Sequence, residues 1–156
     1  MSGSGPTHAE DYTQGAVFAL GSVVVGAGEI VDFARRFDPQ PYHVSAEAGA
    51  ASFFGGLVAS GFHTTAIWMG LYVRALLDGA AVEGSPGLEN VRWHAPVRPG
   101  DTLEGRCEVG EIVPSPFRRD IVTIKKKGSL SRPGEAKPVM TLVLLSRFRR
   151  RDAIGG

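Results

Sequence analysis

The sequence predicts an α+β domain in which an antiparallel sheet packs against one long buried helix. Residues 62–77 are apolar around nearly the whole circumference of a helix, and such a helix belongs in the interior of a protein. After this segment the apolar residues recur with a period of two, which is typical of half-buried strands in an antiparallel sheet. The length of 156 residues suits a single domain with one hydrophobic core.

The N-terminal part of the chain is predicted to be a tail followed by a strand. Residues 1–15 are rich in Gly, Ser, Thr and acidic side chains, and we expect them to form a disordered tail. Residues 16–25 are apolar and β-branched and end at a Gly-Ala-Gly turn, which indicates a first strand. The ordered domain is therefore expected to span residues 16–150.

Two short helices are predicted between the first strand and the long helix. Apolar residues recur at helical spacing over residues 29–37, and the proline after Asp38 keeps that residue out of the α region, so this helix ends there. Because two prolines follow closely, we expect residues 38–43 to form a stiff extended loop. Ser45 is a suitable cap for a second short helix that continues to residue 53.

The long helix is predicted to begin at Ser60-Gly61, and four strands follow it. These strands are expected at residues 88–93, 103–109, 120–127 and 139–148. Ile112 falls out of the alternation, which indicates a bulge near Gly110, and the polar residues 128–135 are expected to form a loop. Five strands curled around one buried helix form the two-layer arrangement called a hot-dog fold.

Composition and charge argue against several classes of function. The formal net charge is +1, so we expect no basic surface for nucleic acid. Cys107 is the single cysteine, which rules out an intrachain disulfide and fits a reducing compartment. The first ten residues lack the pattern of a signal peptide, and residues 62–77 fall short of the roughly 20 that a membrane span needs. We therefore expect a cytoplasmic protein without membrane contact.

Asp38 and His43 are the first candidates for catalysis. They lie five residues apart on a segment that two prolines stiffen, so both side chains can point into one space. A carboxylate and an imidazole in one space tune each other's pKa and suit general acid–base catalysis. The residues alone leave a structural alternative open, in which Asp38 ends the preceding helix and His43 caps a neighbouring element.

Gly61 is the second candidate, because it stands where the long helix begins. The first N–H groups of a helix have no partner within the helix, and the helix dipole is positive at that end. A residue without a side chain lets a ligand oxygen approach these groups, which is the geometry of an oxyanion hole. The alternative is that Gly61 only permits a tight turn into the helix.

Three segments resemble the MaoC-like family of (R)-specific enoyl-CoA hydratases and acyl dehydratases. Residues 38–43, D-P-Q-P-Y-H, are similar to the family pattern D-x-N-P-x-H, and residues 54–61, F-G-G-L-V-A-S-G, are similar to F-x-x-x-I-x-H-G. Residues 91–101, V-R-W-H-A-P-V-R-P-G-D, resemble a strand and turn of the same family, with an aromatic residue before A-P-V and a P-G-D turn after it. The resemblance extends over residues 16–148.

The resemblance implies a hot-dog fold, an acyl-CoA or acyl-carrier thioester as substrate, and reversible addition of water across its 2,3-double bond. Asp38 and His43 would be the acid–base pair, and the N–H of Gly61 would hold the thioester oxygen. No cofactor is implied, because coenzyme A is part of the substrate. Further substrate-binding residues are expected at Gln40, Tyr42, Phe54, Ser60 and His63.

Three positions depart from the family pattern. Gln40 stands where Asn is usual, Ser60 replaces the usual His, and Met69 stands where some of these hydratases carry a serine that supports the dyad. Residues around a catalytic pair orient it and shape its pocket, so these departures bear on substrate choice and on activity.

The remaining polar residues are given structural roles. His63 is expected either to line the pocket or to bond to a backbone carbonyl, and His94 to be structural or to lie in an interface. Cys107 falls on the buried phase of its strand and is expected in the core. Since histidines and carboxylates show no spacing typical of a metal site, we expect no bound metal.

Two competing functions remain. Hot-dog thioesterases usually attack through a carboxylate on the central helix, but residues 61–77 contain neither Asp nor Glu. A non-catalytic acyl-CoA binding protein would explain the three departures, although both Asp38 and His43 are retained. In either case we expect a homodimer or a higher homo-oligomer, because one such domain leaves sheet edges unpaired.

Overall fold

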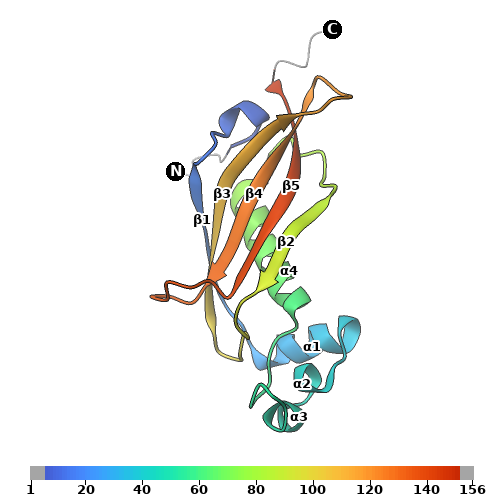
Figure 1. Cartoon of the computed structure of the whole chain (residues 1–156), viewed down its shortest axis with the longest axis vertical. Coiled ribbons are helices and arrows are strands. Elements are labelled where there is room, and N and C mark those ends of the chain that lie inside the picture. The colour runs from blue at the N-terminus through green and yellow to red at the C-terminus, as the bar shows by residue number, and fades with distance from the viewer. Residues whose placement is uncertain (1–5, 152–156) are drawn as a thin grey trace.

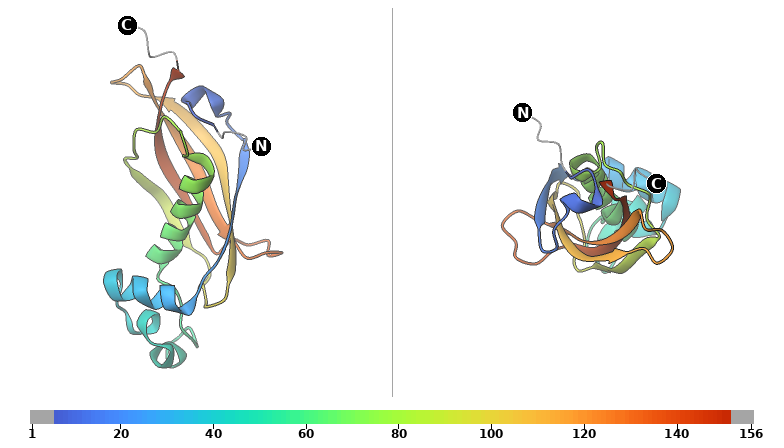
Figure 2. Two further views of the ribbon diagram at one scale, coloured as in Figure 1. Left: turned by 180° about the vertical axis from the view of Figure 1, so that it is seen from behind. Right: turned by 90° about the horizontal axis from the view of Figure 1, so that it is seen from above.

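Five strands form one antiparallel sheet that curls around a long helix in the computed structural model, which describes residues 6–151 (Figures 1 and 2). Their order across the sheet is β1-β3-β4-β5-β2, so β1 and β2 are the edge strands. The strands are β1 (Val17–Val24), β2 (Gly87–Trp93), β3 (Thr102–Pro114), β4 (Ile121–Ser131) and β5 (Met140–Arg149). Helix α4 (Gly61–Leu76) lies on the concave face of the sheet. The predicted α+β hot-dog architecture is confirmed.

Helix α4 buries one side against the sheet and leaves the other side open. Trp68 and Tyr72 are fully buried and stack on each other, with ring centroids 5.0 Å apart. Phe62 and Val73 are 64% and 44% exposed. The predicted burial of the helix on all sides is therefore wrong within a single copy of the chain, because one sheet layer covers only one side of the helix.

Three short helices gather beyond the end of the sheet, beside the start of α4 (Figure 1). They are α1 (Ala27–Phe37), α2 (Pro41–Val44) and α3 (Ala46–Ala50). The extended loop predicted for residues 38–43 is wrong beyond Gln40, because Pro41 opens a helical turn at a position that proline favours. Ser45 caps α3 through the N–H of Ala48 as predicted, but this helix ends before residue 53.

The N-terminal segment is packed onto the sheet over part of the predicted tail. Ala9 and Tyr12 are buried around the short 3₁₀ turn η1 (Ala9–Asp11), and the Tyr12 ring lies edge-on to Phe148 at 4.9 Å. The predicted disorder is therefore wrong for these residues, because buried aromatic contacts outweigh the polar composition. Residues 1–5 of the predicted tail lie outside the described residues.

Lys126 of β4 is fully buried beneath this segment. Its Nζ lies 3.0 Å from the ring centroid of Tyr12 and 5.0 Å from that of Phe148, and it has no hydrogen-bond partner among residues 6–151. Burial lowers the pKa of Lys126 to about 7, whereas the aromatic faces favour its charged form. The free energy of unfolding is therefore coupled to the protonation of this amine.

The strands differ from the predicted ranges mainly in length. The register of β3 and β4 shifts between Val109 and Ile112, which confirms the predicted bulge. β4 continues to Ser131, so the predicted loop at residues 128–135 is wrong for its first half. Within residues 6–151, none of the helices combines the length and the apolarity that crossing a bilayer would demand.

Candidate active site

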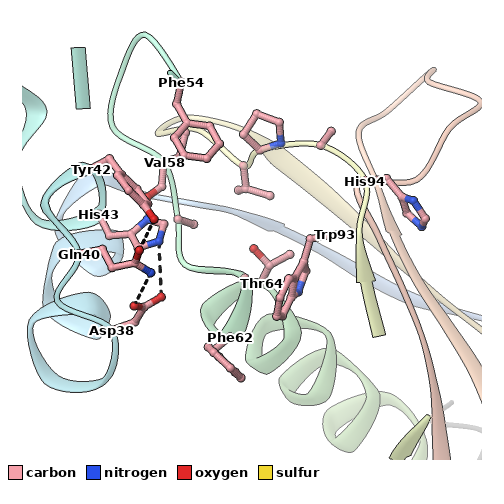
Figure 3. A pocket seen from close by; sticks show the side chains of 15 residues that line it. Asp38, Gln40, Tyr42, His43, Phe54, Val58, Phe62, Thr64, Trp93 and His94 are labelled. Carbon is pink, nitrogen blue, oxygen red and sulfur yellow. Dashed lines mark hydrogen bonds and ion pairs between the residues drawn. The ribbon is translucent and has the colours of Figure 1, made fainter. Parts of the chain in front are cut away.

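A cavity of about 370 Å³ opens at the start of α4, between the short helices and the end of β2 (Figure 3). The structure brings together most of the residues that the sequence singled out. Those that line the cavity are Asp38, Gln40, Tyr42, His43, Phe54 and Gly61.

Asp38 ends helix α1 and turns its carboxylate toward the cavity. Its Oδ1 accepts a hydrogen bond from Gln40 Nε2 at 2.8 Å, and its Oδ2 accepts one from Ser60 Oγ at 2.7 Å. Partial burial raises the pKa of this carboxyl, but the two hydrogen bonds and the nearby His43 outweigh burial, so the pKa lies below its ordinary value. The carboxylate is therefore ionised at neutral pH.

His43 is held in one tautomer by the backbone. Its Nδ1 lies 2.6 Å from the carbonyl oxygen of Val58, and a carbonyl can only accept, so Nδ1 carries the proton. In the neutral form of the ring the free lone pair is therefore on Nε2, which lies 3.5 Å from Asp38 Oδ2 (Figure 3). We call Asp38 and His43 the dyad.

Tyr42 and Gln40 support the dyad on the solvent side. The Tyr42 ring stands edge-on to His43 with centroids 4.5 Å apart and packs against Phe54 at 5.1 Å. Its hydroxyl donates to Gln40 Oε1, and this contact orients the amide so that Nε2 faces Asp38. The longer glutamine side chain thus spans from the tyrosine to the carboxylate.

Ser60 supports the dyad from within the protein. It is fully buried and caps α4, since its Oγ accepts from the N–H of Phe62 at 3.2 Å while it donates to Asp38. Ser60 lies behind the carboxylate and is not among the residues that line the cavity, and its predicted contact with the substrate stays a prediction. The position that is usually His in the family pattern therefore serves here to hold Asp38.

Gly61 borders the cavity at the first turn of α4, but its open side is occupied. A β-carbon at this position would lie closer than 3.0 Å to ring atoms of Trp93, the last residue of β2. Only a glycine at this position leaves room for the indole ring. A ligand oxygen that approached the helix N–H groups would need the same room. Substituting Gly61 would disturb the Trp93 packing together with any contact to the helix N–H groups.

A sequence model of the MaoC like domain matches residues 13–130. The chain belongs to the MaoC-like family. This match takes in the short helices, the dyad, α4 and most of the sheet.

Three known proteins resemble the chain over more than half of its length. The uncharacterized protein YdeM of Bacillus subtilis is 31% identical over 115 residues, which covers 74% of this chain and 82% of that protein. A 3-hydroxybutyryl-CoA dehydratase of Methylorubrum extorquens is 31% identical over 91 residues, covering 58% of this chain and 56% of that protein. The crystal structure of a MaoC-like dehydratase from Rhodospirillum rubrum is 35% identical, with a TM-score of 0.85 over 94% of this chain and 99% of that one.

Two other histidines of this MaoC-like domain lie away from the dyad. His63 is not among the residues that line the cavity, and its predicted contact with the substrate stays a prediction. Its ring stacks on Phe33 with centroids 4.8 Å apart, and Nδ1 has no hydrogen-bond partner within the described part of the chain, so the expected carbonyl bond is wrong. Burial lowers the pKa of His63, which keeps it neutral. His94 borders the cavity but points away from the dyad toward Thr141 (Figure 3).

The cavity also contains residues that sequence reasoning missed. The sequence marks Trp93 only as the aromatic residue before A-P-V, and this position is the available signal for a wall of the pocket. Thr64 of α4 lines the cavity too, whereas Met69 and the buried Cys107 do not. Among residues 6–151, no group of His, Cys, Asp and Glu is arranged to hold a metal ion.

Proposed function

We propose that this MaoC-like protein adds water reversibly across the 2,3-double bond of an enoyl thioester, and removes it from the 3-hydroxyacyl thioester. One observation carries the proposal: an ionised carboxylate, an imidazole fixed in one tautomer and the positive end of a 16-residue helix border the same cavity. Hydration of a conjugated thioester needs a base, a proton donor and stabilisation of an enolate, and these groups provide all three.

The dyad moves the protons of the water molecule. The nucleophilic water binds between His43 Nε2 and a free lone pair of Asp38, and Nε2 takes one proton as the hydroxide oxygen bonds to C3 of the substrate. The electron pair of the double bond moves toward the thioester and forms an enolate. The protonated Nε2 then returns its proton to C2, so the elements of one water are added and both side chains regain their starting states. Asp38 stays ionised and stabilises the transient imidazolium.

The start of α4 stabilises the enolate. Negative charge develops on the thioester oxygen, and the N–H groups and the dipole of the helix N-terminus favour negative charge at this place. The N–H of Gly61 would hold this oxygen, while the Trp93 ring covers the α-carbon side of the residue. No cofactor takes part in the proposed reaction, and coenzyme A or a carrier protein enters as part of the substrate.

The named relative supports this class of substrate. The 3-hydroxybutyryl-CoA dehydratase of Methylorubrum extorquens is named for the elimination that reverses this hydration. The chain spans 56% of that protein, so its substrate is transferred here only as part of the proposal.

A homodimer is part of the same proposal. Within residues 6–151, β2 is an edge strand of the sheet, and its residues Leu88 and Trp93 are exposed along this edge. Phe62 and Val73 leave an apolar stripe on the open side of α4. A second copy on these surfaces would pair the edge and cover the stripe.

A paired assay tests the proposed reaction against the two alternatives. Purified protein is mixed with 2-butenoyl-CoA, and the loss of enoyl-thioester absorbance is followed beside the release of free thiol. We expect the absorbance to fall without thiol release. Thiol release with the double bond intact would indicate a thioesterase. Binding of the thioester without either change would indicate a binding protein.

A further inference from the structure

Gln40 lies between the two members of the dyad, and its backbone is fixed from both sides. Its N–H donates to the carbonyl oxygen of Asp38 at 2.8 Å, and its carbonyl oxygen accepts from the N–H of His43 at 2.9 Å. Pro39 and Pro41 flank it and restrict the neighbouring backbone angles. The side chain, in contrast, projects from an exposed residue, and holding a glutamine in one rotamer costs conformational entropy. A second contact is therefore needed to keep its amide on Asp38.

Tyr42 supplies this second contact (Figure 3). An ionised carboxylate can only accept, so Gln40 turns Nε2 toward Asp38 and leaves its Oε1 for another donor. The hydroxyl of Tyr42 donates to this oxygen. Its ring is partly buried and packs against Phe54, whose carbonyl oxygen accepts from Arg98 Nη2 at 2.6 Å. A packed ring therefore carries the hydroxyl that fixes the exposed amide.

The amide of Gln40 also decides how the Asp38 carboxylate is turned. Ser60 binds Oδ2 at 2.7 Å, and a single contact of this kind leaves the carboxylate free to rotate about it. Gln40 binds the other oxygen, Oδ1, at 2.8 Å and so prevents this rotation. Oδ2 then stays 3.5 Å from His43 Nε2, where the two atoms can share one water molecule. A small misplacement of a catalytic group lowers the rate strongly, so this orientation matters for the reaction.

We propose that Tyr42 is a positioning residue, whose hydroxyl acts through Gln40 to keep the Asp38 carboxylate turned toward His43. This inference rests on the proposed hydratase function. Both Tyr42 and Gln40 line the cavity, and the sequence predicts that they bind substrate. The two roles differ in their kinetic effects, since loss of a substrate contact raises KM and loss of positioning lowers kcat. Asparagine, which is usual at position 40 in the family pattern, is one methylene shorter and would reach the hydroxyl or the carboxylate but not both.

The test is a double-mutant cycle in which kcat and KM are measured with 2-butenoyl-CoA. Tyr42→Phe removes the hydroxyl and keeps the ring, and Gln40→Met keeps the length of the side chain and removes both hydrogen bonds. We expect Gln40→Met to lower kcat about tenfold or more, because a hydrogen bond to a charged group is lost, and Tyr42→Phe to lower it about threefold to tenfold. KM should change little in either variant. The double variant should match Gln40→Met within about twofold, because Tyr42 acts through Gln40.

The ionisation of Asp38 gives a second readout that does not depend on turnover. Burial raises the pKa of this carboxyl, and the hydrogen bond from Gln40 is the largest of the contacts that lower it. Gln40→Met should therefore raise the pKa of Asp38 in an NMR titration of its carboxyl carbon and move the acidic limb of the pH–rate profile to higher pH. Tyr42→Phe should do the same by less, because the amide is then held less firmly.

Tyr12→Phe is the matched control, because it makes the same substitution beside η1, which lies at the opposite end of the sheet from the short helices (Figure 1). The Tyr12 hydroxyl is buried and has no hydrogen-bond partner among residues 6–151, so its loss should leave kcat, KM and the Asp38 titration unchanged. Each variant is checked by circular dichroism. If Gln40→Met does not fold, Gln40→Asn takes its place in the cycle.

The outcomes separate this inference from the function on which it rests. An unchanged protein that hydrates neither 2-butenoyl- nor 2-octenoyl-CoA would refute the proposed function, and the Asp38 titration, measured through the same cycle, would still decide the inference. If Tyr42→Phe raised KM and left kcat and the titration unchanged, the inference alone would be overturned, because the hydroxyl would then contact the substrate. The same holds if the loss from Tyr42→Phe persisted in full in the Gln40→Met background, because the hydroxyl would then act without Gln40.

Discussion

Replacing Asp38 by Asn or His43 by Gln removes one member of the dyad at nearly constant volume. Asp38→Asn removes the negative charge and offers an amide N–H₂ where the carboxylate accepts from Gln40 and Ser60. His43→Gln removes the Nε2 lone pair while leaving an amide that can still donate to the Val58 carbonyl. Each change therefore acts on the chemistry more than on the packing.

The expected loss follows from the roles of the two groups. A positioned acid–base group contributes about 10²–10⁴ to the rate, or about 3–5 kcal/mol in the activation free energy. Each single variant should therefore lower kcat by at least about a hundredfold. The double variant should lose little more than the worse single variant, because a pair that acts as a unit is disabled when either member is removed.

The assay is a double-mutant cycle on kcat with 2-butenoyl-CoA, accompanied by thermal unfolding of each protein. We expect the melting temperatures of the dyad variants to stay close to that of the unchanged protein, because the Asp38 side chain is partly exposed and the amide of His43→Gln can keep the hydrogen bond to Val58. His63→Gln is the matched control. It should lower the melting temperature, because the ring stacks on Phe33, but leave kcat nearly unchanged.

Two results would refute this assignment. If His63→Gln proved as damaging to kcat as His43→Gln while Asp38→Asn stayed active, the chemistry would belong to the helix. If the losses of the two dyad variants multiplied in the double variant, the side chains would act independently.

Three further predictions concern the support of the site, the core and the assembly. Ser60→Ala should lower kcat about tenfold or more with little change in KM. It should also move the acidic limb of the pH–rate profile to higher pH, because the hydrogen bond from Ser60 lowers the pKa of Asp38. The pKa of Lys126 is about 7 in the folded protein and about 10.5 unfolded, so between these values the unfolded chain binds more protons and the free energy of unfolding should rise with pH. Urea unfolding at pH 7 and pH 9 should show this rise. Lys126→Met should make the rise smaller and should increase the free energy of unfolding at pH 7. If the free energy of unfolding rose with pH as steeply in Lys126→Met as in the unchanged protein, the argument from burial would be contradicted. Val73→Glu should turn the dimer into a monomer in sedimentation at micromolar concentration, and a monomeric unchanged protein would contradict the proposed assembly.

The parts of the fold that local patterns control were predictable from the sequence. The start of α4 follows from Ser60-Gly61, the bulge in β3 from the phase change at Ile112, and the end of α1 from the proline after Asp38. The cavity around Asp38 and His43 was predictable because the short segment between them restricts where they can point.

The errors concern contacts between distant segments. The ordered turn at Ala9 depends on Tyr12 meeting Phe148, and no local pattern in a polar segment reveals such a partner. The place of Trp93 in the cavity wall depends on β2 ending beside Gly61, about thirty residues earlier in the chain. The hydrogen bond from Ser60 to Asp38 likewise joins residues 22 positions apart, and the sequence pattern does not indicate it.

The central claim is that water is added to the acyl chain of a thioester that stays intact. The most direct measurement is the position of labelled oxygen in the product. The protein converts 2-butenoyl-CoA in water labelled with heavy oxygen, and the products are analysed by mass spectrometry. We expect one labelled oxygen in the 3-hydroxyl group of 3-hydroxybutyryl-CoA, with the thioester bond unbroken. Label in the carboxylate of free butenoic acid, with no labelled hydroxyacyl thioester, would contradict it.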